Sequence, residues 1–287
     1  MRNSSWGNAM NNTAEIKRRL ASVKQTRQIT GAMETISVAK MRKAVELCEQ
    51  NRAYFEHLRS VVKSIAAMND VEVKEYIAPK RSGAPLVAVI ASDKGLCGGF
   101  NHDVFKLADT VITPDSSIIP IGQTAAERYA KCGGIIDDFV SVNSSDFSGA
   151  KRLSEYILQR YGSEISDVTV VYTEMKSMSV YEPVAVKLLP FERDENVDCT
   201  FEFDPSPAVV LERLMPMYTA GMLFGAVINS AACEHCARRA AMSASTKNAD
   251  EMIEILSVEQ NRARQSSVTE QITEIAGATQ ALDGGSQ

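Results

Sequence analysis

The sequence predicts an α/β protein in which two long terminal helices pair with each other and flank a central domain of alternating strands and helices. Three observations lead to this prediction. Residues 13–68 contain no proline and one glycine, residues 83–193 alternate short apolar runs with helical patterns, and residues 226–276 contain neither glycine nor proline. A long helix needs a partner, because helix propensity alone stabilises little. An antiparallel coiled coil of the two terminal helices is therefore expected.

The first helix is expected over residues 12–70. Its apolar residues recur at steps of three and four, which places them on one stripe of a helix. The stripe consists of Ile16, Leu20, Val23, Ile29, Met33, Ile36, Ala44 and Leu47. The stretch from Ile16 to Lys43 also carries eight Lys or Arg residues and one acid, so it gives a basic face to a protein whose net charge is −5.

The central domain is expected over residues 83–193. Strands are predicted at 85–91, 117–122, 168–175 and 183–191, and helices near 101–112, 123–132 and 148–161. This alternation favours a mostly parallel sheet with both faces covered. The acidic segment 194–207 is interpreted as a connection with one edge strand.

The second long helix is expected over residues 208–283. Pro216, Gly221 and Gly225 predict a kink near its start, and small residues between Ala231 and Ala244 let another helix approach closely. Farther along, an apolar stripe returns at Ile253, Leu256, Val258, Val268, Ile272 and Ile275.

Composition excludes several classes of protein. Of the 287 residues, 45% are hydrophobic and 23% charged, which is typical of a soluble globular protein. The longest apolar run, 220–228, is far shorter than the roughly 20 residues that a membrane span needs. Six scattered cysteines form no disulfide framework, and the first ten residues lack the apolar core of a signal peptide. We expect reduced thiols in a cytosol-like compartment.

The stretch SDKGLCGGFN, residues 92–101, follows a predicted strand and is the first candidate site. Its glycines match neither a dinucleotide loop nor a P-loop. Cys97 as a nucleophile would need a base such as His102, and no orienting group is identifiable. The favoured interpretation is a tight turn from strand to helix whose glycines supply positive φ.

Three further stretches are weighed in the same way. Cys233 and Cys236 form one cysteine pair with no second pair nearby, so packing is favoured over zinc or redox chemistry. The basic stretch 16–43 fits a solvated helix face, a contact with an acidic protein surface, or nucleic acid or anionic membrane, although it lacks aromatic residues for stacking. Residues 261–275 carry Arg262, Arg264, Gln265, Thr269, Gln271 and Glu274 and fit a polar protein contact better than catalysis.

Four stretches together resemble a known family, the gamma subunits of the F-type ATP synthase. They are IKRRLASVKQTRQITGAMETISVAKMRKA (16–44), SDKGLCGGFN (92–101), EHCARRAAMSASTKNADEMI (234–253) and NRARQSSVTEQITEIAGA (261–278). The resemblance covers nearly the whole chain from about residue 12, more loosely between 103 and 230.

The resemblance implies an antiparallel coiled coil with a Rossmann-like α/β domain at its base. It also implies a rotor shaft that turns inside a head of alternating alpha and beta subunits, bound to an epsilon subunit and a membrane ring of c subunits. Such a subunit carries no cofactor, metal ion or catalytic residue of its own. The expected location is the cytoplasmic side of a bacterial inner membrane, as a peripheral protein.

The resemblance also implies roles for individual residues. Contacts with the head are expected at Met33, Arg264, Gln265, Thr269 and Glu274. The basic residues expected to face acidic head surfaces are Lys17, Arg18, Lys24, Arg27 and Lys40. The end of the second helix, 277–282, is expected to reach an apolar bearing in the head.

Several positions depart from the family pattern. Gly31 stands where the family usually has Lys, Gln271 where many members have Glu, and Arg239 where an apolar residue is usual. Arg239 is therefore expected outside the helix contact. The acidic connection holds only Cys199, so the thiol regulation of plant chloroplast gamma subunits is not expected.

Two rival functions remain open from the sequence. The first is a Rossmann-type small-molecule enzyme that acts through the 92–101 turn, which predicts nucleotide binding or turnover by the chain alone. The second is a nucleic-acid-binding helical protein, which predicts strongly salt-dependent affinity.

Overall fold

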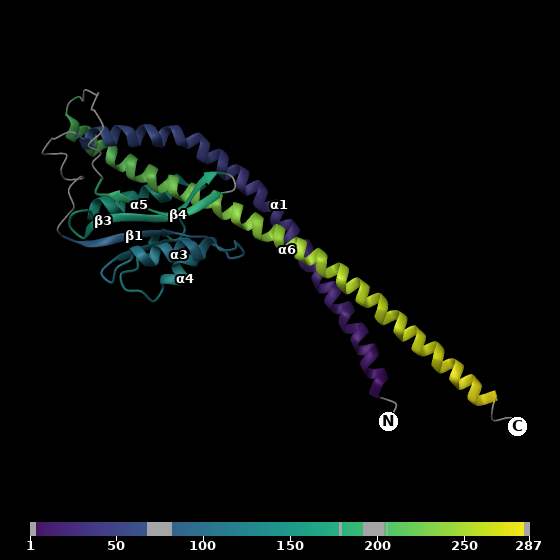
Figure 1. Ribbon diagram of the computed structural model, residues 1–287. Helices are drawn as coiled ribbons and strands as arrows, with labels where there is room; N and C mark the ends of the chain where they lie inside the picture. The colour runs from purple at the N-terminus through teal and green to yellow at the C-terminus, as the bar shows by residue number, and fades with distance from the viewer. Residues whose placement is uncertain (1–3, 68–81, 178–179, 192–203, 205, 284–287) are drawn as a thin grey trace. The chain divides into compact units, whose positions relative to one another are not determined.

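The computed structural model describes residues 4–67, 82–177, 180–191, 204 and 206–283. The chain divides into two compact units, one formed by residues 1–35 with 241–287 and the other by residues 36–240. Helix α1 (Ser4–Ala67) and helix α6 (Pro207–Asp283) each contribute to both units (Figure 1). The predicted fold class is confirmed, since long helices at both ends of the chain flank a four-stranded sheet.

In the first unit, α1 and α6 pair in antiparallel orientation. Arg27 lies against Asp250 and Thr30 against Thr246, so residue numbers rise along one helix as they fall along the other. The residues buried in this pair are Leu20, Thr30, Met242, Ala249 and Leu256. We call this buried line the seam.

The seam corrects the predicted apolar stripe. Ile29 is 53% exposed, whereas its neighbour Thr30 is buried. In the second unit, Ile36 is likewise exposed and Ser37 buried. Thr30 and Ser37 are seven residues apart, so the buried face follows the heptad repeat of a coiled coil and places Ile29 and Ile36 just outside it.

The apolar stripe predicted on α6 is only partly buried. Leu256 is buried and Ile253 partly buried, as predicted. The other four apolar residues assigned to that stripe are exposed, namely Val258, Val268, Ile272 and Ile275. Arg239 is exposed, as expected from its charge.

The second unit contains a mixed sheet with the strand order β2-β1-β3-β4. Strand β1 (Ala84–Ile90) runs parallel to β2 (Ser117–Ile121) and β3 (Ile165–Ser177), and β4 (Val180–Leu189) pairs antiparallel with β3. In the centre of the sheet, Ala88 lies between Ile119 and Val170. All four predicted strands are present.

Both faces of the sheet are covered, as the continuous apolar sequence of β1 requires. Helix α3 (Phe100–Val111) packs on one face through Val104 and Ala108, with Tyr129 of α4 (Gln123–Tyr129) in the same cluster. Helix α5 (Phe147–Arg160), the end of α1 and the start of α6 pack on the other face. Figure 1 shows α3 and α4 on the side of the sheet away from α6. A 3₁₀ turn, Asp137–Phe139, links α4 to α5.

The start of α6 is a continuous helix through Pro216. Gly221 and Gly225 serve close packing against α1, because a Cβ atom built on them would lie 3.1 Å and 3.3 Å from the ring of Phe55. The segment 194–207, with its expected edge strand and Cys199, lies outside the described residues except for 204, 206 and 207. Of the described helices, none is long and apolar enough to cross a membrane.

Candidate functional site

The C-terminal half of α6 carries most of the residues predicted to contact a partner. Arg264, Gln265 and Thr269 are all exposed. Thr269 donates a hydrogen bond to the carbonyl of Gln265 at 2.9 Å, which is a local contact within the helix. Glu274 lies on the same helix, but its side chain lies outside the part that the structure describes.

A row of exposed apolar residues accompanies these polar ones, where the sequence predicts an apolar stripe buried against the partner helix. Val268, Ile272 and Ile275 follow each other at steps of four and three, so they share one face of α6. Their exposed fractions are 47%, 62% and 68%. Gln265, Thr269 and Ile272 are spaced in the same way, so polar and apolar groups lie side by side. We call Arg264, Gln265, Val268, Thr269, Ile272 and Ile275 the distal face.

Such a mixture of apolar and hydrogen-bonding side chains on one helix face is typical of protein interfaces. The signal for it was present in the sequence. Ile272 and Ile275 do not continue the heptad positions of Ala249 and Leu256, which are buried. A strict heptad count from these buried residues would have placed both isoleucines outside the seam.

On α1, the predicted basic residues fall into two groups. Lys17, Arg18, Lys24 and Lys40 are exposed. Arg27 is half-exposed, and its Nε donates to Asp250 Oδ1 at 2.9 Å. Arg27 therefore forms an ion pair between the two helices, and its charge is partly neutralised by Asp250. Met33 is partly buried.

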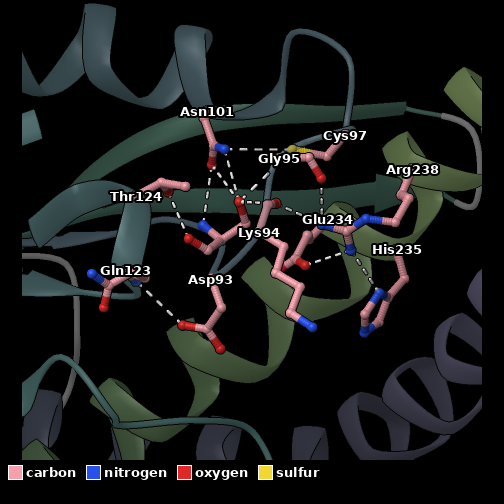
Figure 2. Close-up of polar contacts among 11 residues, drawn as sticks. Asp93, Lys94, Gly95, Cys97, Asn101, Gln123, Thr124, Glu234, His235 and Arg238 are labelled. Carbon is pink, nitrogen blue, oxygen red and sulfur yellow. Dashed lines mark hydrogen bonds and ion pairs between the residues drawn. The ribbon is translucent and has the colours of Figure 1, made fainter. Parts of the chain in front are cut away.

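The turn at 92–101 lies in the second unit and is held by its own polar groups (Figure 2). Asn101 Oδ1 accepts from the Ser92 amide at 3.1 Å, and Asn101 Nδ2 donates to Ser92 Oγ at 2.7 Å. Thr124 donates to the Ser92 carbonyl through its hydroxyl at 2.6 Å and its amide at 3.1 Å. Gly98 has φ +60° and Leu96 has φ +64°. The predicted turn from β1 to α3 is present, but of its three glycines only Gly98 has a positive φ, and Leu96 takes the other positive-φ position.

Arg238 of α6 is hydrogen-bonded to the backbone of this turn. Its Nη2 donates to the carbonyls of Lys94 and Gly95 at 2.8 and 3.3 Å, and its Nη1 donates to Glu234 Oε1 at 2.6 Å. Figure 2 shows the guanidinium of Arg238 between the turn, Glu234 and His235. Burial lowers the pKa of His235 to about 4, with further contributions from the positive charges of Arg238 and Lys40. Burial also raises the pKa of Glu234, against the opposing effect of Arg238.

Apolar contacts complete this junction. Cys97 and Phe100 of the turn form a buried cluster with Cys233 and Ala237 of α6. Burial raises the pKa of the Cys233 thiol to about 12, which disfavours the reactive thiolate. Cys97 is 2% exposed, and its Sγ lies 3.5 Å from Asn101 Nδ2, while His102 is exposed on α3.

The position of this junction in the sheet has a chemical consequence. Strand β1 lies between β2 and β3, so the turn after β1 occupies the switch point where doubly wound folds commonly bind ligands. Here α6 fills that place with Cys233, Ala237 and Arg238. Among the described residues, no cluster of three or more His, Cys, Asp or Glu side chains is arranged to hold a metal ion.

Comparison with known proteins agrees with the resemblance. Residues 12–282 match the family model described as ATP synthase. Relatives named ATP synthase gamma chain are 35% identical over 279 residues in Pelotomaculum thermopropionicum and 37% identical over 283 residues in Ruminococcus albus. Each alignment covers 94% of this chain and 98% of the relative.

Solved structures share the fold at low sequence identity. A chain of the Euglena gracilis mitochondrial ATP synthase, OSCP/F1/c-ring, in rotational state 3, is similar with a TM-score of 0.70, 17% identity and 96% coverage of both chains. A chain of the rotor of the same enzyme in rotational state 1 gives a TM-score of 0.67 at 18% identity, covering 90% of this chain and 99% of that one. The family match over almost the full length and the identities above 30% lead to one conclusion: this chain belongs to the ATP synthase family and, within it, to the gamma chains.

Proposed function

We propose that this chain is the central-stalk rotor subunit of a bacterial F-type ATP synthase. In this proposal it couples ion-driven rotation of a membrane c-ring to successive conformational changes at the nucleotide sites of the beta subunits. Synthesis of ATP and, in reverse, its hydrolysis take place on those subunits. The proposed partners are alpha and beta subunits, an epsilon subunit and the c-ring, at the cytoplasmic side of the inner membrane.

The observation that carries the proposal is the distal face of α6. Val268, Ile272 and Ile275 are exposed beside Arg264, Gln265 and Thr269, on a helix that continues to Asp283. Exposed apolar residues in a row mark a surface that a partner covers. The similar solved structures are a rotor and an F1/c-ring assembly of an ATP synthase, which supports a partner of the same kind here.

A shaft can change a nucleotide site that it does not touch only through differential binding. Each conformation of a beta subunit must offer the distal face a different contact free energy, and rotation then moves the favoured conformation from one subunit to the next. Exposed basic residues on α1, including Lys17, Arg18 and Lys24, fit complementary acidic surfaces nearby. The proposed parts are the shaft helices 12–70 and 208–283 and the α/β domain 83–193.

The chain itself performs no bond chemistry in this proposal. Support comes from the switch point of the sheet, which α6 fills with Arg238 and the apolar cluster at Cys97. A small-molecule enzyme of this fold would need that place for its ligand.

Affinity capture of the tagged chain from gently solubilised membranes tests the proposal. We expect alpha, beta and epsilon subunits in the eluate, together with ATPase activity. We also expect the purified chain alone to show neither nucleotide binding nor ATP turnover. Recovery of the chain by itself from membranes that hold an active ATP synthase would refute the assignment.

A further inference from the structure

Arg238 holds an unusual position in the second unit. It is the one charged residue that is buried among the described residues, with 9% of its surface exposed. Burying a charge is costly unless it is paired and hydrogen-bonded. Arg238 meets this condition through Glu234 and through two backbone carbonyls that lie more than 140 residues earlier in the chain.

These two carbonyls join Arg238 to the central strand of the sheet. Lys94 and Gly95 lie four and five residues after β1 ends at Ile90. The Lys94 carbonyl also accepts a hydrogen bond from Ser92 Oγ at 2.8 Å, and Ser92 is in turn fixed by Asn101 and Thr124. A force on the guanidinium group of Arg238 therefore reaches β1 and α3 through directional hydrogen bonds.

The remaining contacts of the turn with α6 have a different character. Cys97 and Phe100 meet Cys233 and Ala237, which are small residues in an apolar cluster. Apolar burial is non-directional, so it holds two surfaces together without fixing their alignment. A forked guanidinium bound to two carbonyls and one carboxylate fixes both the axial position and the rotation of a helix.

We propose that Arg238 is the positioning residue that locks α6 to the α/β domain, so that torque passes between the long helix and the sheet without slip. This inference rests on the proposed rotor function. It gives a role in transmitting torque to a residue that lies 26 or more positions before the distal face in α6. The partners of the lock are the carbonyls of Lys94 and Gly95, with Glu234 holding the guanidinium in place.

The test uses the whole ATP synthase carrying variants of this chain, in inverted membrane vesicles. Arg238→Met keeps the methylene packing but leaves the Glu234 carboxylate without its partner. The main variant is therefore Glu234→Gln/Arg238→Met, which removes both charges together. Arg239→Met is the matched control, because Arg239 is the next residue on the same helix and is exposed.

Two quantities are measured, ATP hydrolysis and the proton pumping that it drives. In the double variant, we expect hydrolysis to remain near the parent level while pumping against an imposed proton gradient falls several-fold. Arg238→Lys, which keeps the charge but not the forked geometry, should recover part of the pumping. Amide hydrogen exchange at Ser92, Phe100 and Thr124, whose amides donate hydrogen bonds at the turn, should become about tenfold faster in the double variant, because the turn loses its charged anchor.

The outcomes separate the two proposals. An unchanged ratio of pumping to hydrolysis in the double variant would overturn the lock, even if exchange in the turn became faster. If the double variant is not incorporated, Arg238→Lys carries the test, and full pumping in that variant would count equally against the lock. Absence of the parent chain from the ATP synthase would refute the rotor function itself.

Discussion

Thr246 donates a hydrogen bond to Thr30 across the pair of helices, with 2.8 Å between the two hydroxyl oxygens. Thr30 donates in turn to the carbonyl of Arg27 at 3.1 Å, and Arg27 binds Asp250 on the opposite helix. The seam of the first unit thus has a polar part, with buried apolar residues Leu20 and Leu256 on one side of it and Met242 on the other. In coiled coils, a polar residue at a buried position fixes register at a cost in stability.

The threonine pair should show a measurable coupling energy. In a double-mutant cycle with Thr30→Val and Thr246→Val, we expect the two single changes to be non-additive by about 0.5–1 kcal/mol of unfolding free energy. The double variant should be close to the parent in stability, because both partners are replaced by apolar groups of the same shape. Urea unfolding followed by circular dichroism measures all four chains. Strict additivity would show that the hydrogen bond contributes nothing.

Two glycines should respond in opposite directions to alanine. Gly31→Ala should stabilise the chain by about 1 kcal/mol, because glycine is unfavourable in a helix and nothing beyond the neighbouring helix backbone lies within 4 Å of the added Cβ. Gly221→Ala gains the same propensity but forces the ring of Phe55 to move, at a cost of about 1–3 kcal/mol. We therefore expect a net loss of stability at Gly221, measured as the urea midpoint. Equal stabilisation at both positions would contradict the close packing of Phe55.

His235 should make stability depend on pH. Its pKa is about 4 in the folded chain and 6.5 ordinarily, so the unfolded state binds the proton more readily between these values. The unfolding free energy contributed by His235 therefore falls as the pH decreases from about 6.5 towards 4. Glu234, next to His235 in the chain, also has a raised pKa and also makes stability depend on pH. The contribution of His235 is therefore the difference between the pH profiles of the parent chain and of His235→Gln, which lacks the imidazole. His102→Gln, at an exposed position, is the control, and an unchanged pH profile in His235→Gln would refute the prediction.

The distal face should matter for assembly and coupling but not for folding. Ile272→Asp changes a side chain that is 62% exposed, so we expect an effect on stability within about 0.5 kcal/mol. The same variant should fail to couple ATP synthesis, because a buried unpaired charge would enter the partner contact. Ser266→Asp adds a charge at an exposed neighbour and serves as the control.

The double variant Arg264→Ala/Gln265→Ala should also weaken coupling while its helicity stays intact. A normal rate of ATP synthesis in this variant would contradict the proposed role of Arg264 and Gln265 in the partner contact.

Much of the fold could be predicted because its signals are local. The apolar run of β1 and the glycines after it define a strand and a turn within a few residues, and the absence of proline defines α1. The face of a helix is harder to predict. Ile29 and Thr30 are adjacent, and only the partner helix decides which of them is buried. Small polar residues can occupy a close helix contact, so the predicted apolar stripe is one position out of phase at Ile29 and Ile36, although Leu20 and Ala44 are buried as predicted.

Polar contacts between residues far apart in the chain could not be predicted from the sequence. Arg238 lies within a stretch that resembles the family, yet nothing near it in the chain indicates that it binds carbonyls at Lys94 and Gly95. The pairing of Arg27 with Asp250 has no local signal for the same reason, since the sequence predicts only that Arg27 belongs to a basic helix face. In both cases the charge was visible in the sequence, but its partner was not.

The proposed function requires this chain to turn within the head while ATP is hydrolysed. The most direct measurement is single-molecule rotation, with the head fixed to a surface and a probe attached through the exposed thiol of Cys132, after replacement of Cys199 by serine. We predict unidirectional rotation of the probe that starts with added ATP and stops when hydrolysis is inhibited. Active hydrolysis with a motionless probe on intact complexes would contradict the rotor function.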